Sequence, residues 1–513
     1  MKKRNTAIRA LSVFLAYAMV CTSVPAAGQE MFGSGVNRET EENTSDLKEF
    51  QSSQADEFGT DTGSDAELFG SDDAKQEFQD GENSEEGTDG IRYIKGRPLT
   101  EEESDLTSVY AAYGNREAAF PSSYDARKEG LVTPVKNQNP FGTCWAFGMA
   151  AIMETSLLAQ NKGTYDLSEE HLSYFFSNRQ NDPLGNTPDD KNYVLGNYHV
   201  IGGNDHLAAI YLSTWSGMTT EADVPFPTDS SHQNDLTVQI PESKAYNSAA
   251  YLKNASVSKY SEERMKEMLL NDHAVSIMLY MKESYVNPDT AAYCYPVGKS
   301  NSTVINHIVT VVGWDDTYSK DNFLPVSNVT SDGAWIIKNS WGEKKGDGGY
   351  YYLSYQDPNI SKLVSAEAVA ASDQKYRNNY FYDGSSALSV IPIQAGQSVA
   401  AVYETTAGKG KAEVLGEVNL VTNSDNACYK IQIYTDLTDP YDPESGTAAY
   451  AAPYEFEQPI AGVQTISVPE VVLKQGSRYS VVITNSGIDK ISFGVEAKSS
   501  YGNWFTCTAG IET

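Results

Sequence analysis

The sequence predicts an α+β domain of two lobes, preceded by an acidic segment without regular structure and followed by an all-β sandwich domain. Two observations support the α+β domain: apolar residues at helical spacing occur early in it, and buried strand patterns are grouped late. A third supports the sandwich, because helix signals end near residue 371 and short alternating strands with frequent turns follow. A chain of 513 residues has room for two to four domains.

The first 28 residues have the pattern of a secretory signal peptide. Lys2, Lys3 and Arg4 give a positive start, residues 10–20 form a short apolar run, and small residues follow up to Gly28. We therefore expect residues 1–28 to be removed and the mature protein to be secreted and extracellular, with association to the cell surface left open. No later stretch approaches 18 consecutive apolar residues, so no transmembrane segment is expected in the mature chain.

Residues 29–90 form an acidic low-complexity segment that we expect to be disordered. Positions 30–89 hold 19 acidic and three basic residues, which is about half of the net charge of −31. So few apolar residues with so much charge cannot offset the entropy of ordering. The rest of the chain is mildly acidic and offers no basic face, so nucleic-acid binding is not expected. Residues 91–117 are a candidate for a short propeptide.

The α+β domain is expected over residues 118–371. Apolar residues at helical spacing predict a helix over 150–160, which Gly163 ends. Ser168 stands before two glutamates, as an N-cap does, and predicts the start of a second helix.

Three strands are expected later in this domain. A β-branched, apolar run over 304–314 predicts a buried strand, and residues 333–339 and 350–355 predict two more. The glycine-rich residues 346–349 mark a turn between the last two.

Residues 372–513 are expected to form the all-β sandwich. Residues 428–434 alternate between apolar and polar side chains, as do parts of 463–468 and 479–483. Four cysteines remain after the signal peptide, too few for a disulfide scaffold in a chain of this length. Whether Cys428 and Cys507 form a disulfide is left open.

Cys144 is the candidate nucleophile. A thiol reacts as its thiolate, so a catalytic cysteine needs surroundings that lower its pKa. Cys144 follows Gly142 and Thr143 and opens an apolar helical run, whose positive end favours the thiolate. A lone free cysteine is more often a buried structural residue, so Cys144 needs support from its context.

Three segments around the candidate nucleophile resemble the motifs of papain-like cysteine peptidases of the C1 family. Residues 137–147 resemble the family's cysteine segment, residues 306–309 its histidine strand, and Asn-Ser-Trp-Gly at 339–342 its asparagine segment. The three occur in the family's order. The resemblance implies a helical lobe and a β-barrel-like lobe. Separately, the strand texture of residues 376–383 and 428–434 resembles the lectin-like domain that follows papain-like modules in some secreted bacterial proteins, notably of Firmicutes.

The resemblance also implies catalytic roles. Cys144 would be the nucleophile, His307 the general base, and Asn339 the residue that orients the imidazole. Gln138, six positions before the nucleophile, would supply its side-chain amide to an oxyanion hole completed by the backbone N–H of Cys144. Trp341 would shield the hydrogen bond between His307 and Asn339 from water.

Substrate-binding residues follow from the same resemblance. Gly202 and Gly203 are similar to the family's cleft segment, where backbone groups pair with an extended peptide; a simple turn is the alternative. Met278, Ile305 and Ile308 are expected to line an apolar pocket for the second residue before the cut. Trp341 and Asn306 are further substrate-binding candidates. No cofactor or metal is implied, and the remaining histidines lack metal-ligand spacing.

The sequence departs from the family at two paired positions. Phe141 and Val200 stand where the family has two cysteines that form a disulfide, so apolar packing is expected to replace the covalent link. No long helical prodomain precedes Phe120, which leaves the mechanism of latency open.

The sequence therefore predicts a secreted cysteine endopeptidase that acts on protein or peptide substrates. Residues 372–513 resemble the lectin-like domain that follows papain-like modules in some secreted bacterial proteins, which implies a carbohydrate or cell-surface ligand. A stabilising appendage is an equally good interpretation of these residues. Two other functions stay open for the whole chain: an adhesin or binding protein with a vestigial peptidase module, and a cell-wall peptide hydrolase.

Overall fold

A computed structural model describes most of the chain after Phe120, and all described residues lie in one compact unit, Gln54–Thr513. The described residues are 84–86, 92–94, 120–178, 198–199, 202–228, 239–299, 305–381, 388–422, 424–496 and 507–512. The expected signal peptide lies outside them, as do most of the acidic segment and of the propeptide candidate. Within that N-terminal region, strand β1 (Ser84–Glu86) pairs antiparallel with β2 (Arg92–Ile94). This pair was not predicted, because strands of three residues are too short to show alternation.

Four α-helices occur among the described residues: α3 (Cys144–Ala159), α4 (Glu169–Asn178), α5 (Asp205–Leu212) and α6 (Glu262–Asp272). Both expected helices are confirmed. Helix α3 begins at Cys144, as expected of the apolar run that Cys144 opens, and this is six residues before the recognisable helical spacing at 150. It is buried along nearly its whole length. The Ser168 hydroxyl accepts a hydrogen bond from the backbone N–H of His171, as expected of the N-cap of α4. Short 3₁₀ helices cover Glu242–Lys244, Glu283–Tyr285, Lys320–Asn322, Pro325–Ser327 and Ala371–Asp373.

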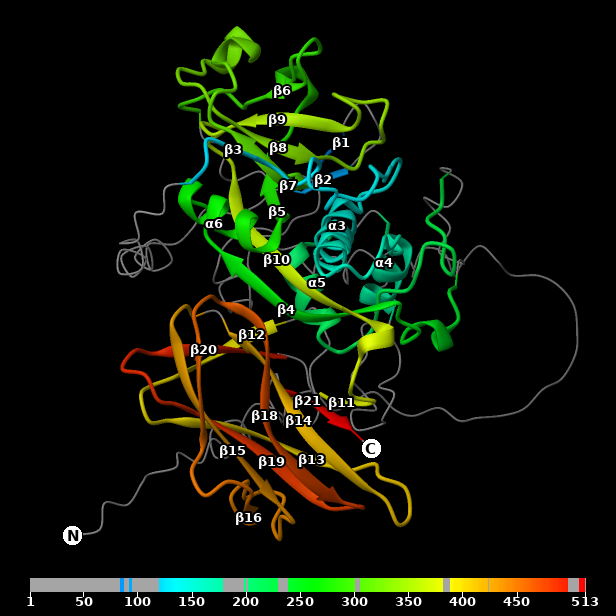
Figure 1. Cartoon of the computed structure of the whole chain (residues 1–513), viewed down its shortest axis with the longest axis vertical. Coiled ribbons are helices and arrows are strands. Elements are labelled where there is room, and N and C mark those ends of the chain that lie inside the picture. Colours follow the sequence, from blue (N-terminus) through cyan, green and yellow to red (C-terminus); the bar gives the residue numbers. More distant parts are fainter. Residues whose placement is uncertain are drawn as a thin grey trace, which may run out of the picture. The chain divides into compact units, whose positions relative to one another are not determined.

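The strands of the α+β domain form one largely antiparallel sheet, seen beside α3 in Figure 1. They are β3 (Ser123–Asp125), β4 (Ala250–Ser258), β5 (Val275–Leu279), β6 (Ala292–Tyr293), β7 (His307–Asp315), β8 (Ala334–Lys338), β9 (Tyr350–Ser354) and β10 (Ser361–Ala370). Their order is β4-β10-β5-β7-β8-β9-β6, with β3 added to β7. Strands β7, β8 and β9 confirm the three expected strands.

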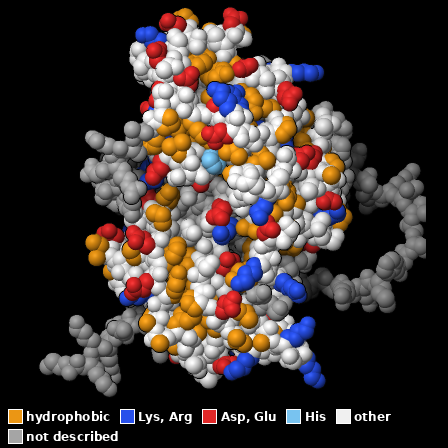
Figure 2. Space-filling view, in the orientation of Figure 1, with side chains coloured by type: hydrophobic (Ala, Val, Ile, Leu, Met, Phe, Trp, Pro, Cys, Tyr) orange, Lys and Arg blue, Asp and Glu red, His pale blue; other side chains and the backbone are white. Residues whose placement is uncertain are grey.

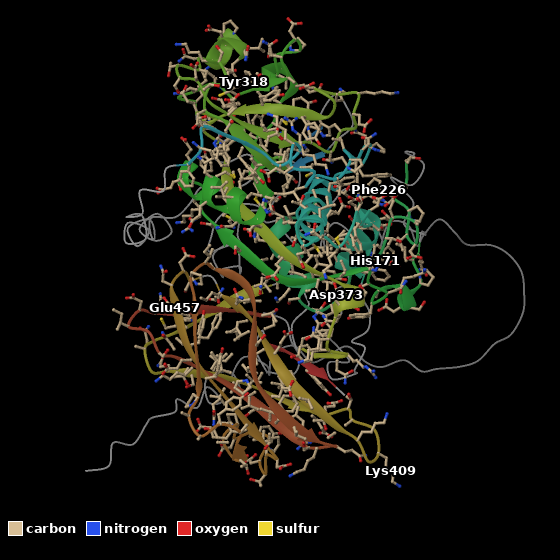
Figure 3. All side chains as sticks on the ribbon, in the orientation of Figure 1. His171, Phe226, Tyr318, Asp373, Lys409 and Glu457 are labelled. Carbon is tan, nitrogen blue, oxygen red and sulfur yellow. The ribbon has the colours of Figure 1, made fainter. Side chains whose placement is uncertain are left out.

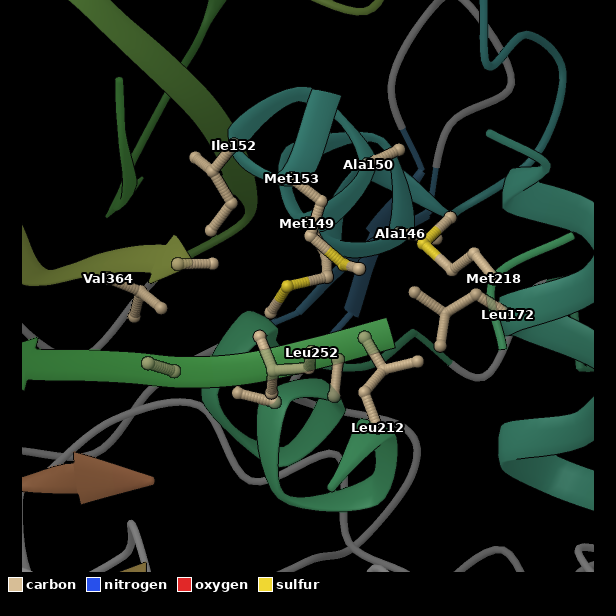
Figure 4. Packing of buried hydrophobic residues seen from close by; sticks show 14 of the residues in the cluster. Ala146, Met149, Ala150, Ile152, Met153, Leu172, Leu212, Met218, Leu252 and Val364 are labelled. Atoms are coloured by element: carbon tan, nitrogen blue, oxygen red, sulfur yellow. The ribbon is translucent and has the colours of Figure 1, made fainter. Parts of the chain in front are cut away.

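The two largest hydrophobic clusters of the α+β domain are separate cores. In the first, side chains of α3 such as Met149 and Met153 pack with Leu212 of α5 and Leu252 of β4 (Figure 4). The second is formed mainly by the large side chains of β7, β8 and their neighbours, including Trp314, Trp335 and Tyr351. Trp145, next to the candidate nucleophile, belongs to the first core, and Trp341 belongs to the second. The catalytic motifs therefore lie where the two lobes meet.

The C-terminal part is an all-β sandwich, as expected. Its strands are β11 (Asn378–Tyr380), β12 (Leu388–Ile393), β13 (Ser398–Glu404), β14 (Ala412–Thr422), β15 (Ala427–Thr435), β16 (Thr447–Ala448), β17 (Tyr454–Gln458), β18 (Gly462–Lys474), β19 (Arg478–Asn485), β20 (Ile491–Glu496) and β21 (Cys507–Glu512). One sheet contains β14 and β18, the other contains β15 and β19, and buried side chains from both form a single core. The inward alternation of Tyr429, Ile431 and Ile433 is the pattern that predicted β15.

The sandwich is joined to the α+β domain through a shared sheet, which the sequence did not predict. Strand β18 pairs with β4 at Gly462 and Val463. Gly462 has a positive φ, and a Cβ there would lie 2.1 Å from the carbonyl oxygen of Ala255, so only glycine fits. The Asn254 side-chain oxygen accepts a hydrogen bond from the backbone N–H of Thr465 at 2.8 Å.

Charged side chains of both signs are interspersed over the face of the molecule seen in Figure 2. In the part of the chain that the structure describes, no helix is long and apolar enough to cross a membrane.

Candidate active site

Cys144 is the first residue of α3 and is partly exposed. One helical turn later, Gly148 allows α3 to pack tightly against the sheet. A Cβ at Gly148 would lie 2.9 Å from both Ile308 Cγ2 and Ser276 Oγ. This close approach holds the start of α3 beside the start of β7, where His307 lies.

His307 and Asn339 form the hydrogen bond that the motifs imply. His307 Nε2 lies 2.8 Å from Asn339 Oδ1, and both side chains are buried. Asn339 Oδ1 also accepts the backbone N–H of Ser340 at 2.8 Å, which fixes the side-chain oxygen toward the imidazole. Because an amide oxygen only accepts, the proton of this hydrogen bond is on Nε2, and Nδ1 is the ring nitrogen that can exchange a proton with another group.

Trp341 covers this hydrogen bond. Its ring stacks on the imidazole of His307, with centroids 4.8 Å apart and planes inclined by 24°. The indole is buried and belongs to the second core, so the imidazole is supported by a rigid part of the fold. Shielding from water strengthens a hydrogen bond of this kind.

Gln138 is fully buried next to the same segment. Its side-chain amide donates to the carbonyl of Phe141 at 2.8 Å, and its side-chain oxygen accepts the hydroxyl of Ser340 at 2.5 Å. The backbone N–H of Gln138 donates to the carbonyl of Ser340 at 2.8 Å. An amide NH₂ group has two hydrogens, and one is used in the contact with Phe141. The orientation of Gln138 therefore depends on both the cysteine and the asparagine segments.

The surroundings of Cys144 oppose a lone thiolate. Burial raises the pKa of Cys144 to about 11, and the charge of Asp205 acts in the same direction. Backbone groups of Ile308 and Trp145 act in the opposite direction and are outweighed. The backbone at the start of α3 acts in the expected direction, since the groups of Trp145 and Cys144 lower the pKa, but burial outweighs this effect. A thiolate at Cys144 needs a proton acceptor nearby, because the backbone hydrogen bonds do not offset desolvation and pairing with a positive charge would favour the thiolate further.

Gly202 and Gly203 occupy positions where a larger side chain would be strained or would clash. Gly202 has a φ of +75°, which favours glycine. A Cβ at Gly203 would lie 2.6 Å from the indole of Trp145, so the chain passes directly over the residue that follows the candidate nucleophile.

The expected apolar pocket residues lie together. Met278 and Ile308 are direct partners across β5 and β7, and both belong to the first core together with Ile305. Asn306 instead uses both ends of its side-chain amide within the fold. It accepts from the backbone N–H of Met281 at 2.7 Å and donates to the carbonyl of the same residue at 2.9 Å.

Asp205 is a buried charge near the nucleophile that sequence reasoning missed. Its Oδ2 accepts the hydroxyl of Ser276 at 2.5 Å, and its Oδ1 lies 3.6 Å from His206 Nδ1. Lys362 continues the group, with Nζ 3.5 Å from His206 Nε2. An acidic residue in the first turn of a helix is common, so no local pattern indicates this placement.

A buried ionic network supports the strand end that carries Asn339. Lys136 Nζ lies 2.8 Å from Glu154 Oε1 and 2.9 Å from Glu169 Oε1. Burial lowers the pKa of Lys338, whose ammonium donates to the hydroxyl of Thr133 at 2.9 Å. The network and the asparagine segment line a cavity of about 20 Å³. In the described part of the chain, no group of three or more histidine, cysteine or acidic side chains is arranged to hold a metal ion.

Phe141 is the one of the two positions departing from the family motif that lies among the described residues. Phe141 is fully buried and packs against the ring of His199, with centroids 4.3 Å apart. Val200, the other replaced position, lies outside the described residues. The described cysteines Cys144, Cys294 and Cys428 are free thiols, and the side chain of Cys507 is not described.

Comparison with known proteins supports the assignment that the motifs suggest. Residues 120–371 match the family model described as papain family cysteine protease. Fruit bromelain of Ananas comosus is 25% identical over 238 residues, covering 46% of this chain and 56% of the relative. Cysteine proteinase 1 of Entamoeba histolytica is 28% identical over 234 residues, covering 45% and 62%. The chain thus spans about three fifths of the length of these relatives. Residues 120–371 belong to the papain family of cysteine proteases.

Solved structures extend the likeness of fold to the sandwich. A structure of the cysteine protease and lectin-like domains of Cwp84, a surface layer associated protein of Clostridium difficile, aligns with a TM-score of 0.62 at 21% identity. It covers 81% of this chain and 97% of that one. A second, of clostridial Cwp84 after propeptide cleavage, aligns with a TM-score of 0.61 at 23% identity, covering 77% and 100%. The likeness to Cwp84 therefore covers both the papain-like domain and the all-β domain of this chain.

Proposed function

We propose that this protein is a secreted cysteine endopeptidase, with Cys144 as nucleophile, His307 as general base and acid, and Asn339 as the residue that orients His307. The observation that carries the proposal is the buried 2.8 Å hydrogen bond between His307 and Asn339 beneath Trp341. It leaves Nδ1 of the imidazole as the proton acceptor, in a strand held against the first turn of α3.

In the first half of the reaction, His307 Nδ1 takes the proton of Cys144 while the sulfur attacks the scissile carbonyl carbon. The carbon–oxygen double bond becomes an oxyanion, which the Gln138 amide and the backbone N–H of Cys144 stabilise. The intermediate collapses to a thioester, the carbon–nitrogen bond breaks, and the imidazolium gives its proton to the leaving amine. The raised pKa of Cys144 makes this transfer dependent on His307.

In the second half, water attacks the thioester and His307 accepts its proton. The carbon–sulfur bond breaks, the carboxylic acid leaves, and the sulfur regains its proton from the imidazolium. The substrate would lie extended along Gly202 and Gly203, with an apolar side chain near Met278 and Ile308.

The proposal is tested with the full chain and two cysteine variants. Wild type, Cys144→Ala and Cys428→Ala are assayed on casein and on fluorogenic peptides. Cys428 is the matched control, because it is another free, partly exposed thiol, far along the chain in the sandwich. We expect activity in wild type and Cys428→Ala and none in Cys144→Ala. Absence of cleavage by wild type, or full activity in Cys144→Ala, would contradict the proposal and favour a binding protein or a cell-wall peptide hydrolase.

For residues 372–513 we propose a surface-targeting role as a second function, with a carbohydrate ligand. The support is the fold shared with the structure whose second domain is named lectin-like. Binding of full-length Cys144→Ala to a glycan array tests this without self-cleavage. Binding to one glycan class supports the role, and binding to none leaves the sandwich as a stabilising domain. The boundaries 118–371 and 372–513 and the signal peptide at 1–28 are part of the same proposal.

A further inference from the structure

A buried cluster contacts the loop between Gln138 and Cys144. Phe141 lies in this loop, and its ring packs against the ring of His199 at 4.3 Å. The next residue, Gly142, donates its backbone N–H to the carbonyl of His199 at 2.7 Å. His199 therefore contacts the loop through both its side chain and its backbone.

Glu170 fixes His199 in turn. This residue is near the start of α4, and its Oε2 lies 2.7 Å from His199 Nε2. Its other oxygen accepts the hydroxyl of Tyr198 at 2.5 Å. All three side chains are buried. A buried carboxylate is stabilised when its oxygens are hydrogen-bonded. Here each oxygen of Glu170 is hydrogen-bonded, one to Tyr198 and the other to His199.

Phe226 completes the enclosure of Phe141. Its ring meets Phe141 edge-on at 5.5 Å and Phe147 of α3 at 5.0 Å. Its backbone N–H donates to the carboxylate of Glu221 at 2.7 Å, which fixes the ring's position (Phe226 is labelled in Figure 3). Edge-to-face pairs at these distances are favourable and directional.

Movement of Phe141 would be transmitted to the oxyanion hole. The carbonyl of Phe141 accepts the side-chain amide of Gln138 at 2.8 Å, and its backbone N–H donates to the carbonyl of Gln138 at 2.9 Å. The carbonyl of Phe141 is thus one of two groups that set the orientation of the amide, the other being the hydroxyl of Ser340.

We propose that Glu170 and His199 are positioning residues for the oxyanion hole, which hold the Phe141 loop by a buried hydrogen bond and ring packing where the family uses a disulfide. The inference rests on the proposed peptidase function and extends it. Neither residue touches the substrate in this proposal. Both act through Phe141 on Gln138, so their loss should affect oxyanion stabilisation more than the reactivity of the thiol.

The test compares two reactions of Cys144 in the full-length protein. Peptide hydrolysis and binding of a peptide aldehyde both place an oxyanion in the hole, whereas alkylation by iodoacetamide forms none. Removing one oxyanion donor costs about 100- to 1000-fold in kcat, so displacing Gln138 should cost on the order of 10- to 100-fold. We expect His199→Ala and Glu170→Ala to lose this much in kcat and in aldehyde affinity. The alkylation rate and KM should each change by less than about threefold.

Three comparisons separate positioning from loss of stability. His171→Ala is the matched control, because it removes another buried histidine from the same lobe, one bonded to the carbonyl of Lys244. It should leave the ratio of hydrolysis to alkylation unchanged. Glu170→Gln should recover part of the loss, since the side-chain oxygen can still accept one hydrogen bond. The double variant Gln138→Ala/His199→Ala should have a kcat within about threefold of that of Gln138→Ala alone, because both substitutions act on the same oxyanion donor.

Equal losses of hydrolysis and alkylation, unchanged hydrolysis in the variants, or additive losses in the double variant would overturn the inference. If the alanine variants do not fold, the test is made with Glu170→Gln. The ratio of its hydrolysis rate to its alkylation rate should be lower than that of wild type, and an unchanged ratio overturns the inference. Inactive wild type instead refutes the proposed function. Active wild type with inactive Cys144→Ala and normal His199→Ala refutes only the positioning role.

Discussion

Replacing Asn339 with alanine removes the acceptor of the hydrogen bond that orients His307. In the structure this bond is 2.8 Å long and buried. In the proposed mechanism the imidazole becomes protonated during the reaction. A hydrogen bond to a charged group contributes about 1.5–3 kcal/mol. Since about 1.4 kcal/mol corresponds to a tenfold change in rate, Asn339→Ala should lower kcat/KM by about 10- to 150-fold.

The assay is kcat/KM on a fluorogenic peptide, measured beside thermal unfolding. Asn339→Ala also leaves the backbone N–H of Ser340 without its acceptor, so some stability is lost as well. Asn485→Ala controls for this effect, because Asn485 is a buried asparagine of the sandwich whose amide donates to the carbonyls of Ile393 and Asp489. It should lower the unfolding temperature without lowering kcat/KM. Retention of more than half of the activity by Asn339→Ala, or equal losses in both variants, would refute the reasoning.

Three further predictions concern charge and packing. Asp205→Asn should lower the pKa of Cys144 from about 11, because the charge of Asp205 raises that pKa. The measurement is the rate of iodoacetamide alkylation as a function of pH. A pH profile identical to that of wild type would contradict the prediction. Gly203→Ala should reduce activity at least tenfold, because its Cβ would lie 2.6 Å from the Trp145 indole; wild-type kinetics in this variant would show that the segment can move aside. Burial raises the pKa of Asp357 from 3.8 to about 7, so the native state disfavours the charged form. The contribution of Asp357 to stability should therefore be most favourable below pH 4 and should fall as the pH rises to 7. The difference corresponds to on the order of 4 kcal/mol, and Asp357→Asn should flatten this part of the profile of unfolding free energy against pH.

The sequence was most informative where the determining contacts are local. The strand patterns of β7, β8 and β9 and the N-cap at Ser168 depend on residues within a few positions of one another, and the structure confirms them. The start of α3 at Cys144 was also predicted, from the apolar run that Cys144 opens, and the structure confirms it. The helical spacing itself was recognisable only from residue 150, because a helix buried on all sides lacks the polar face that makes such spacing visible.

Features set by long-range pairing left no local pattern. The bond between Glu170 and His199 joins residues 29 positions apart, and β4 pairs with β18 about two hundred residues later in the chain. Asp205 stands in no recognisable motif, and only the packing of α5 near Ser276 reveals that its charge acts on Cys144. The raised pKa of Cys144 likewise depends on burial, which the motif does not report.

The most direct test of the account is the site and rate of labelling by a thiol-reactive peptidyl epoxide, located by peptide mass mapping. We predict a single adduct on Cys144 in wild type and no adduct at that position in Cys144→Ala. Labelling should be slowed at least a hundredfold in His307→Ala, which lacks the proton acceptor. Labelling of Cys294 or Cys428 in place of Cys144, or undiminished labelling of Cys144 in His307→Ala, would contradict the assignment of nucleophile and base.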